Sequence, residues 1–204
     1  MFQKSYVFAM CLLFIIVVAG CSSHLTLDST LAEINSLDQK YGVSWKMDLF
    51  VPNATGKDLE SLGVELSERA TSLAVQNESM LAAIMASRAL MVNSQERFSR
   101  AGVYGEKGHA YVIRGGSLDF YSGLRPTVDC KNLEVYSRVA DLVDEGLSLG
   151  SESNDAFQAA LSLATPEEKA KLGRPNFYAL DLRPVIAFSK DNRDGIALCT
   201  RIRD

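Results

Sequence analysis

Histidine is scarce in this chain, which has 204 residues but only His24 and His109. No cluster of His, Cys, Asp and Glu has the spacing of a zinc site. The sequence also lacks a nucleophile elbow, a phosphate-binding loop and a calcium-binding loop. These absences argue against the common hydrolases, and we expect a protein that is not an enzyme and needs no cofactor or metal.

An excess of basic residues is also missing. The chain has 21 Lys and Arg against 25 Asp and Glu, a formal net charge of −4, without a block of one sign. Nucleic-acid binding is favoured by a basic stripe, and an anionic membrane surface also attracts cations. We therefore expect no nucleic-acid partner, and any membrane attachment needs another cause.

The first twenty residues have the layout of a secretory signal, with Lys4 before an apolar run that extends from about Tyr6 to Gly20. The run ends in Val18-Ala19-Gly20-Cys21. Small residues before a cysteine in this context resemble the lipobox of exported lipoproteins. The resemblance implies cleavage before Cys21, lipidation of Cys21 with a diacylglycerol and attachment to the outer face of a membrane. In a two-membrane host, Ser22 would allow passage to the outer membrane.

The alternative interpretation of this run is an uncleaved transmembrane anchor. A helix of about 15 residues measures roughly 22 Å, which is short for a hydrocarbon core of about 30 Å. Lys4 favours an internal N-terminus under this interpretation too, so the domain would still lie outside the cytoplasm.

The cysteines are consistent with export. Cys11 would leave with the leader and Cys21 would carry lipid, which leaves Cys130 and Cys199. Two cysteines outside the reducing cytoplasm favour a disulfide. Two separately buried thiols are the alternative.

The helical spacing of apolar residues dominates the first half of the mature chain. We expect a tether over residues 21–28, then a helix that is capped by Thr30 and Glu33 and ends at Gly42. Residues 43–51 are a candidate strand. The proline-free stretch 55–101 predicts one long helix or two helices with a break near Asn77. Asn53 and Asn77 also head glycosylation sequons.

The second half contains shorter predicted elements. We expect a helix from about 129–132 to 149, a second from 154 to 164, and a third that starts at Thr165-Pro166 and stops near Gly173. The apolar runs 185–188 and 196–199 flank Asp194-Gly195, which predicts a C-terminal β-hairpin.

The glycine-rich segment 102–117 is the best candidate for a binding site. Tyr104, His109 and Arg114 combine there an aromatic ring, the one histidine after the tether and a cation. The alternative is a solvated connector. An enzyme would require at least two of Glu106, His109, Arg114 and Asp119 to converge. Met80, Met85 and Met91 suggest an adaptable surface or, in the simpler interpretation, core filling.

Together these patterns predict a signal peptide over 1–20 and a single extracytoplasmic, mainly α domain over 29–204 with a small C-terminal β element. The leading functional hypothesis is a lipid-anchored interaction or assembly module of the cell envelope, with another envelope protein as partner and an exposed apolar patch on its helices. The alternative is a small-ligand-binding lipoprotein with a pocket near Tyr104, His109 and Arg114.

Overall fold

The computed structural model describes residues 25–43, 56–101, 130–172 and 182–203. These residues form helices and contain no strand, so the mainly α class is as expected. The helical elements are α2 (Leu27–Lys40), α3 (Gly56–Val75), α4 (Ser79–Arg100), the 3-10 turn η1 (Cys130–Asn132), α5 (Leu133–Leu163), α6 (Pro166–Leu172) and α7 (Arg183–Arg203). Among the residues described, no helix is both long and apolar enough to cross a bilayer.

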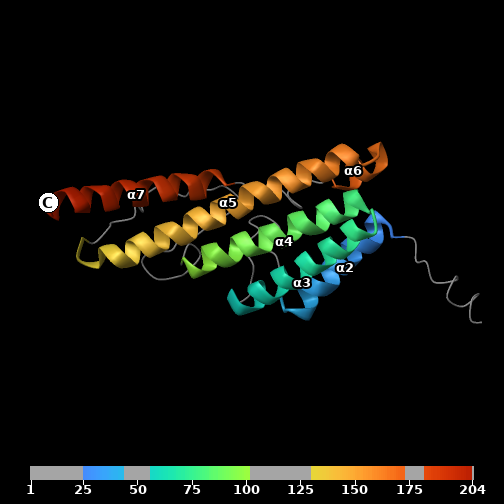
Figure 1. Cartoon of the computed structure of the whole chain (residues 1–204), viewed down its shortest axis with the longest axis horizontal. Coiled ribbons are helices and arrows are strands. Elements are labelled where there is room, and N and C mark those ends of the chain that lie inside the picture. The colour runs from blue at the N-terminus through green and yellow to red at the C-terminus, as the bar shows by residue number, and fades with distance from the viewer. Residues whose placement is uncertain (1–24, 44–55, 102–129, 173–181, 204) are drawn as a thin grey trace, which may run out of the picture.

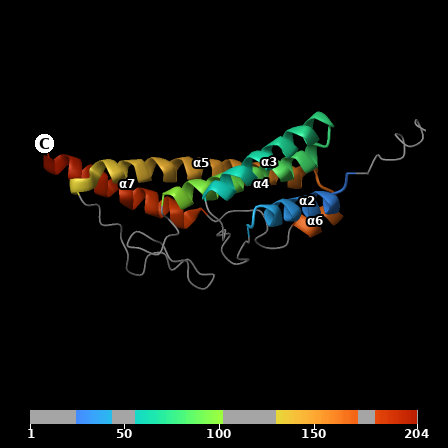
Figure 2. The same cartoon turned by 90° about the horizontal axis from the view of Figure 1, so that it is seen from below.

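Helix α4 is the centre of the bundle. Helices α3 and α5 pack along it, while α2 covers its first half and α7 lies along the first half of α5 (Figure 1). Buried residues lie on most sides of α4, and they include Leu81, Met85 and Val92. Figure 2 shows α2 and α6 on one side of the layer formed by α3, α4 and α5. A helix that is buried nearly all round must lie between other helices.

The apolar interior has two parts. The larger cluster joins α2, α3, α6, most of α4 and the second half of α5, around side chains such as Ile34, Leu66 and Ile84. The smaller cluster joins the end of α4 to α5 and α7 through Phe98, Val143 and Phe188. Because α4 and α5 contribute to both clusters, the pair of long helices connects the two halves of the bundle.

Local signals set several helix ends. Gly42 has φ of +65° after α2, and Asn77 has φ of +63° between α3 and α4. Both conformations are left-handed, which glycine and asparagine tolerate best. Thr165 and Glu168 form a reciprocal cap at the start of α6. The stretch 55–101 is therefore a helical hairpin, the second of the two alternatives.

The start of the first helix was predicted too late. Helix α2 begins at Leu27, because Thr26 and Ser29 form the capping box. Thr30, the expected cap, is buried inside the helix. The predicted tether over 21–28 therefore extends two residues too far, because Leu27 and Asp28 belong to α2.

The predicted break after residue 149 is wrong, because α5 is continuous over 31 residues. Gly146, Gly150 and Ser153 lie inside this helix and are buried. Small residues allow α4 and α5 to approach closely, and the gain in packing outweighs the weak helix propensity of glycine.

The predicted C-terminal hairpin is also wrong, because residues 183–203 form the single helix α7. Asp194 and Gly195, the expected turn, lie inside this helix. Its buried side chains Val185, Phe188 and Cys199 follow helical spacing along α5. The candidate strand 43–51 lies, beyond Val43, outside the described residues.

Candidate functional site

An open groove lies beside α3 and is lined by described residues. It lies next to the end of α2 and has a volume of about 590 Å³. Its lining residues come mainly from one face of α3: Tyr41, Glu60, Ser61, Val64, Glu65, Glu68, Arg69 and Ser72. Three of these are carboxylates and one is a guanidinium, so the groove has an acidic character.

Glu65 is the best-connected carboxylate of this groove. Its Oε2 atom accepts hydrogen bonds from Lys40 Nζ at 2.5 Å and from the Tyr41 hydroxyl at 2.7 Å. The bond from Lys40, followed by that from Tyr41, lowers the pKa of Glu65. The same contact raises the pKa of Lys40 above its ordinary value. Glu65 is therefore ionised and held in place at neutral pH.

The remaining lining defines the kind of ligand that the groove fits. Val64 is 56% exposed in the middle of the carboxylates. Arg69 is turned toward α2 by an ion pair with Glu33, 3.1 Å between Nε and Oε1. An apolar centre between acids fits a cation with an apolar body better than it fits an anion.

A disulfide between Cys130 and Cys199 marks a second region of interest, separate from the groove. The Cα atoms of the two cysteines are 5.2 Å apart, consistent with the pairing expected from the sequence. The bond joins the start of α5 to the last turns of α7. Both sulfurs are used in the bond, so neither cysteine is a nucleophile in this state.

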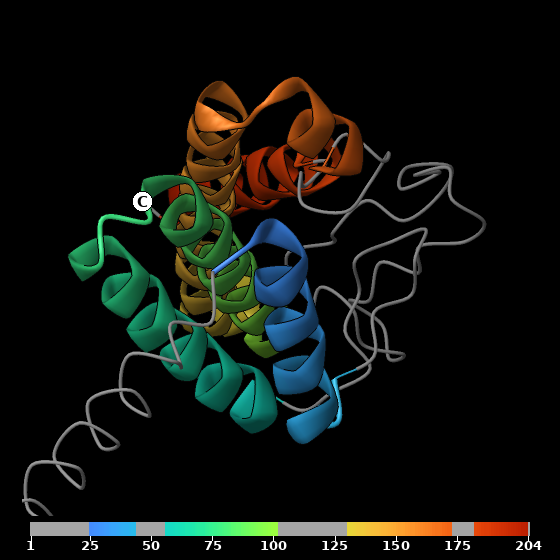
Figure 3. The same ribbon diagram turned by 90° about the vertical axis from the view of Figure 1, so that its right-hand side faces the viewer.

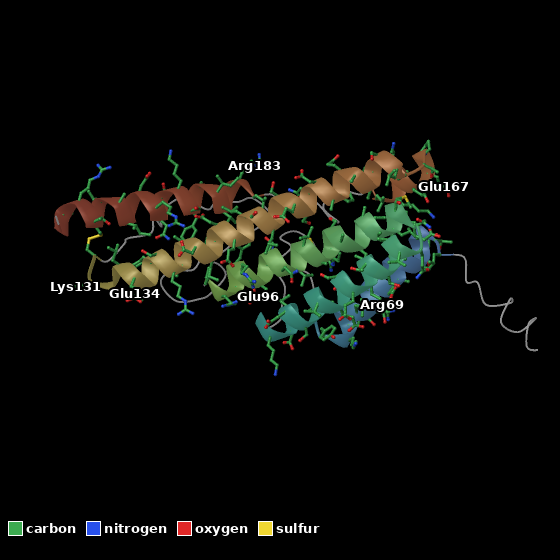
Figure 4. The ribbon with its side chains drawn as sticks, in the orientation of Figure 1. Arg69, Glu96, Lys131, Glu134, Glu167 and Arg183 are labelled. Carbon is green, nitrogen blue, oxygen red and sulfur yellow. A yellow bond between two sulfur atoms is a disulfide. The ribbon has the colours of Figure 1, made fainter. Side chains whose placement is uncertain are left out.

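Exposed apolar side chains cluster in sequence around this disulfide. Val135 is 61% exposed, Leu198 59% and Ile202 71%. Val135 lies five residues after Cys130, and the other two flank Cys199. We call this region, which includes Lys131 and Glu134, the disulfide end. In Figure 4, Lys131 and Glu134 lie at one end of the bundle and Glu167 of α6 lies at the other.

The polar groups inside the bundle have structural roles. Arg88 of α4 pairs with Asp38 of α2. Ser87 Oγ donates to the carbonyl of Ser153, and Ser153 Oγ donates to the carbonyl of Ser87, at 2.9 and 2.8 Å. Ser94 Oγ donates to the carbonyl of Gly146 at 2.7 Å. These bonds satisfy polar atoms where α4 meets its neighbours.

The structure accounts for some of the predicted site residues. Cys21, Tyr104, His109 and Arg114 lie outside the described residues, as do Glu106, Asp119 and Asn53. Among the methionines, Met85 and Met91 are fully buried and Met80 packs on the core, so core filling is the correct interpretation. Asn77 is exposed. The described part of the chain holds no group of three or more potential metal ligands.

The groove was not predicted from the sequence. Lys40 and Glu65 are 25 positions apart and lie on different helices, so no spacing rule connects them. The spacing of Glu60, Glu68 and Ser72 on one helix face was the only available signal, and such a pattern is usual for a solvated face.

Comparison with known proteins finds no match: no family model, no curated protein and no solved structure is similar to this chain.

Proposed function

We propose that this chain is an exported lipoprotein, anchored through Cys21, that acts as a helical interaction module of the cell envelope. The leader and the small residues before Cys21 motivate the anchor. A disulfide between Cys130 and Cys199 supports an oxidising compartment, because such bonds persist outside the cytoplasm. The anchor lies on the extracytoplasmic face of the cytoplasmic membrane, or on the outer membrane in a two-membrane host.

The interaction role rests on one observation: the disulfide end has apolar side chains that are exposed to solvent and are not part of the hydrophobic core. Val135, Leu198 and Ile202 are each more than half exposed. Exposed apolar groups that cluster on a folded domain mark contact surfaces. The exposed charged residues near these side chains in the sequence are the cations Lys131, Arg138 and Arg201 and the acids Glu134 and Asp194.

The partner that fits this surface is a protein with an apolar patch and an acidic rim. Apolar groups at the centre of an interface contribute most of the affinity, while charges at the rim steer the encounter. A partner of this kind would cover Leu198 and Ile202 and place carboxylates near Arg201. We therefore expect binding to weaken as salt concentration rises.

Site-specific photocrosslinking in the native envelope tests the proposal. A photoreactive residue at Leu198 is expected to give one adduct with an envelope protein, which mass spectrometry identifies. The matched control places the same probe at Asp155, an exposed residue in the second half of α5, away from the disulfide end. The adduct must disappear in Ile202→Asp, and the purified partner must bind the isolated protein. Equal labelling at both positions, or no adduct, contradicts the interaction role.

The anchor has its own test. Intact mass of the protein extracted from its membranes is expected to correspond to a chain that starts at Cys21 and carries a diacylglycerol. A chain that retains residues 1–20 without lipid contradicts lipidation.

A second candidate function is the binding of a small cationic ligand in the groove beside α3. The acidic lining and the volume of about 590 Å³ favour it, whereas the pocket expected near Tyr104, His109 and Arg114 lies outside the described residues. Calorimetric titration with spermidine tests this candidate. Spermidine binding that is lost in Glu68→Gln but kept in Glu152→Gln on α5 supports this function. The same heat of binding in both variants contradicts it.

A further inference from the structure

The end of the bundle opposite the disulfide has a defined position relative to the proposed lipid. Only residues 22–26 separate Cys21 from Leu27, the first residue of α2. Six Cα–Cα steps span at most about 21 Å in a fully extended chain. If Cys21 carries its lipid in the headgroup region, the start of α2 must lie within that distance of the bilayer surface.

Several other elements meet at the same end. The α3–α4 turn, the end of α5 and α6 all lie around the start of α2 (Figure 3). Lys171 Nζ of α6 contacts Asp28 Oδ2 of α2 at 2.8 Å, which joins the two elements directly. We call this region the anchor end: the first turn of α2, residues 75–79, the end of α5 and α6.

The anchor end has two large apolar side chains that are exposed to solvent. Val75, the last residue of α3, is 79% exposed, and Leu163, the last residue of α5, is 56% exposed. Beside them in the sequence lie the uncharged Gln76, Asn77 and Thr165, with Glu78 and Glu167 slightly further along the chain. Apolar side chains among uncharged polar groups suit the boundary between headgroups and acyl chains.

The long sides of the bundle are less suited to a lipid surface. Glu60 and Glu68 are exposed on α3. Glu145, Glu152 and Asp155 are exposed on α5. Acidic faces are repelled by an anionic leaflet. At the anchor end the acids are Asp28, Glu78, Glu167 and Glu168 and the cations are Lys169 and Lys171, with Asp28 paired to Lys171. Its fit to the bilayer therefore rests on its exposed apolar side chains and on the short link to Cys21.

We propose that the anchor end rests on the bilayer that holds the Cys21 lipid, with Val75 and Leu163 in the interfacial region and the disulfide end directed away from the membrane. This inference rests on the proposed lipid anchor. Helix α5 alone is about 45 Å long at 1.5 Å per residue. Leu198 and Ile202 then lie far above the membrane, where a partner in the envelope can reach them.

Fluorescence quenching by lipid measures this orientation. The lipidated protein is reconstituted into vesicles of phosphatidylethanolamine and phosphatidylglycerol that contain nitroxide-labelled lipid. A fluorophore is attached to Val75→Cys, Glu152→Cys or Ile202→Cys, and a free-thiol count of one per chain verifies that the native disulfide is intact. We expect several-fold stronger quenching at position 75 than at positions 152 and 202.

The other outcomes overturn the orientation. Similar quenching at all three positions means that the bundle lies flat on the membrane, and no quenching at position 75 means that the end does not touch it. In the Val75→Cys protein, Leu163→Asp is expected to lower the quenching, because it places a charge at the interface without changing the core. Unchanged quenching in this variant would overturn the role of the exposed apolar side chains.

Failure of the anchor is distinguishable from failure of the orientation. A protein without lipid on Cys21, by intact mass, does not float with the vesicles, and the proposed function itself then fails. A lipidated protein that floats with the vesicles but shows no quenching at position 75 overturns only the orientation.

Discussion

Asp38 of α2 and Arg88 of α4 form an ion pair that is almost completely removed from solvent, with side chains 9% and 5% exposed. It joins the first helix after the proposed tether to the central helix of the bundle. Removal of one partner from a buried pair leaves an uncompensated charge, which typically costs about 3–5 kcal/mol. The pair therefore holds α2 in one register on α4.

The first prediction concerns this pair. Asp38→Asn and Arg88→Met are each expected to lower the free energy of unfolding by about 3–5 kcal/mol, measured by urea denaturation. The double variant Asp38→Leu/Arg88→Met removes both charges and is expected to recover most of the loss. A double variant whose loss of stability equals the sum of the two single losses would show that the two residues act independently.

The second prediction concerns the disulfide. Cys130→Ser/Cys199→Ala opens a loop that spans 69 positions, and the chain-entropy model gives a loss of about 4 kcal/mol. The last turns of α7 are expected to lose amide-exchange protection first, because Cys199 is the only buried side chain described after Asn192. Uniform loss of protection along α7 would contradict this local role.

The third prediction concerns the close contact of α4 and α5. A Cβ atom on Gly146 would lie 2.5 Å from Cε1 of Phe98, whose side chain is buried. Gly146→Ala is therefore expected to destabilise the protein by about 1–3 kcal/mol, despite the better helix propensity of alanine. Ser148→Ala, on the exposed side of the same helix, is the control. A Gly146→Ala protein more stable than this control would contradict the close packing.

The fourth prediction concerns pH. The lowered pKa of Glu65 means that its contacts with Lys40 and Tyr41 stabilise the fold above the ordinary glutamate value of 4.5. This contribution is expected to vanish as pH falls through the lower folded-state value. NMR titration of the Glu65 carboxylate measures the shift, and Lys40→Met is expected to raise its pKa toward 4.5. An unchanged pKa in this variant would show that Lys40 is not the main cause.

Local sequence signals determined much of the helical layout. Gly42 and Asn77 end helices because they accept positive φ, and Thr165-Pro166 starts α6 because its residues suit a helix N-terminus. The cysteine count indicated the pair Cys130 and Cys199. Each of these signals lies within a few residues of its effect, so no knowledge of distant contacts is needed.

Tertiary contacts decided the rest. Asp194-Gly195 has the local preference of a turn, but Val185, Phe188 and Cys199 bury one face of a continuous helix against α5. Glycine often follows the end of a helix, but Gly150 lies inside α5, where the absence of a side chain makes room for Leu182 and Ser94. The groove contact between Lys40 and Glu65 and the buried pair of Asp38 and Arg88 join positions that are 25 and 50 residues apart. Such pairs have no sequence signature, because burial and proximity arise only when the helices pack.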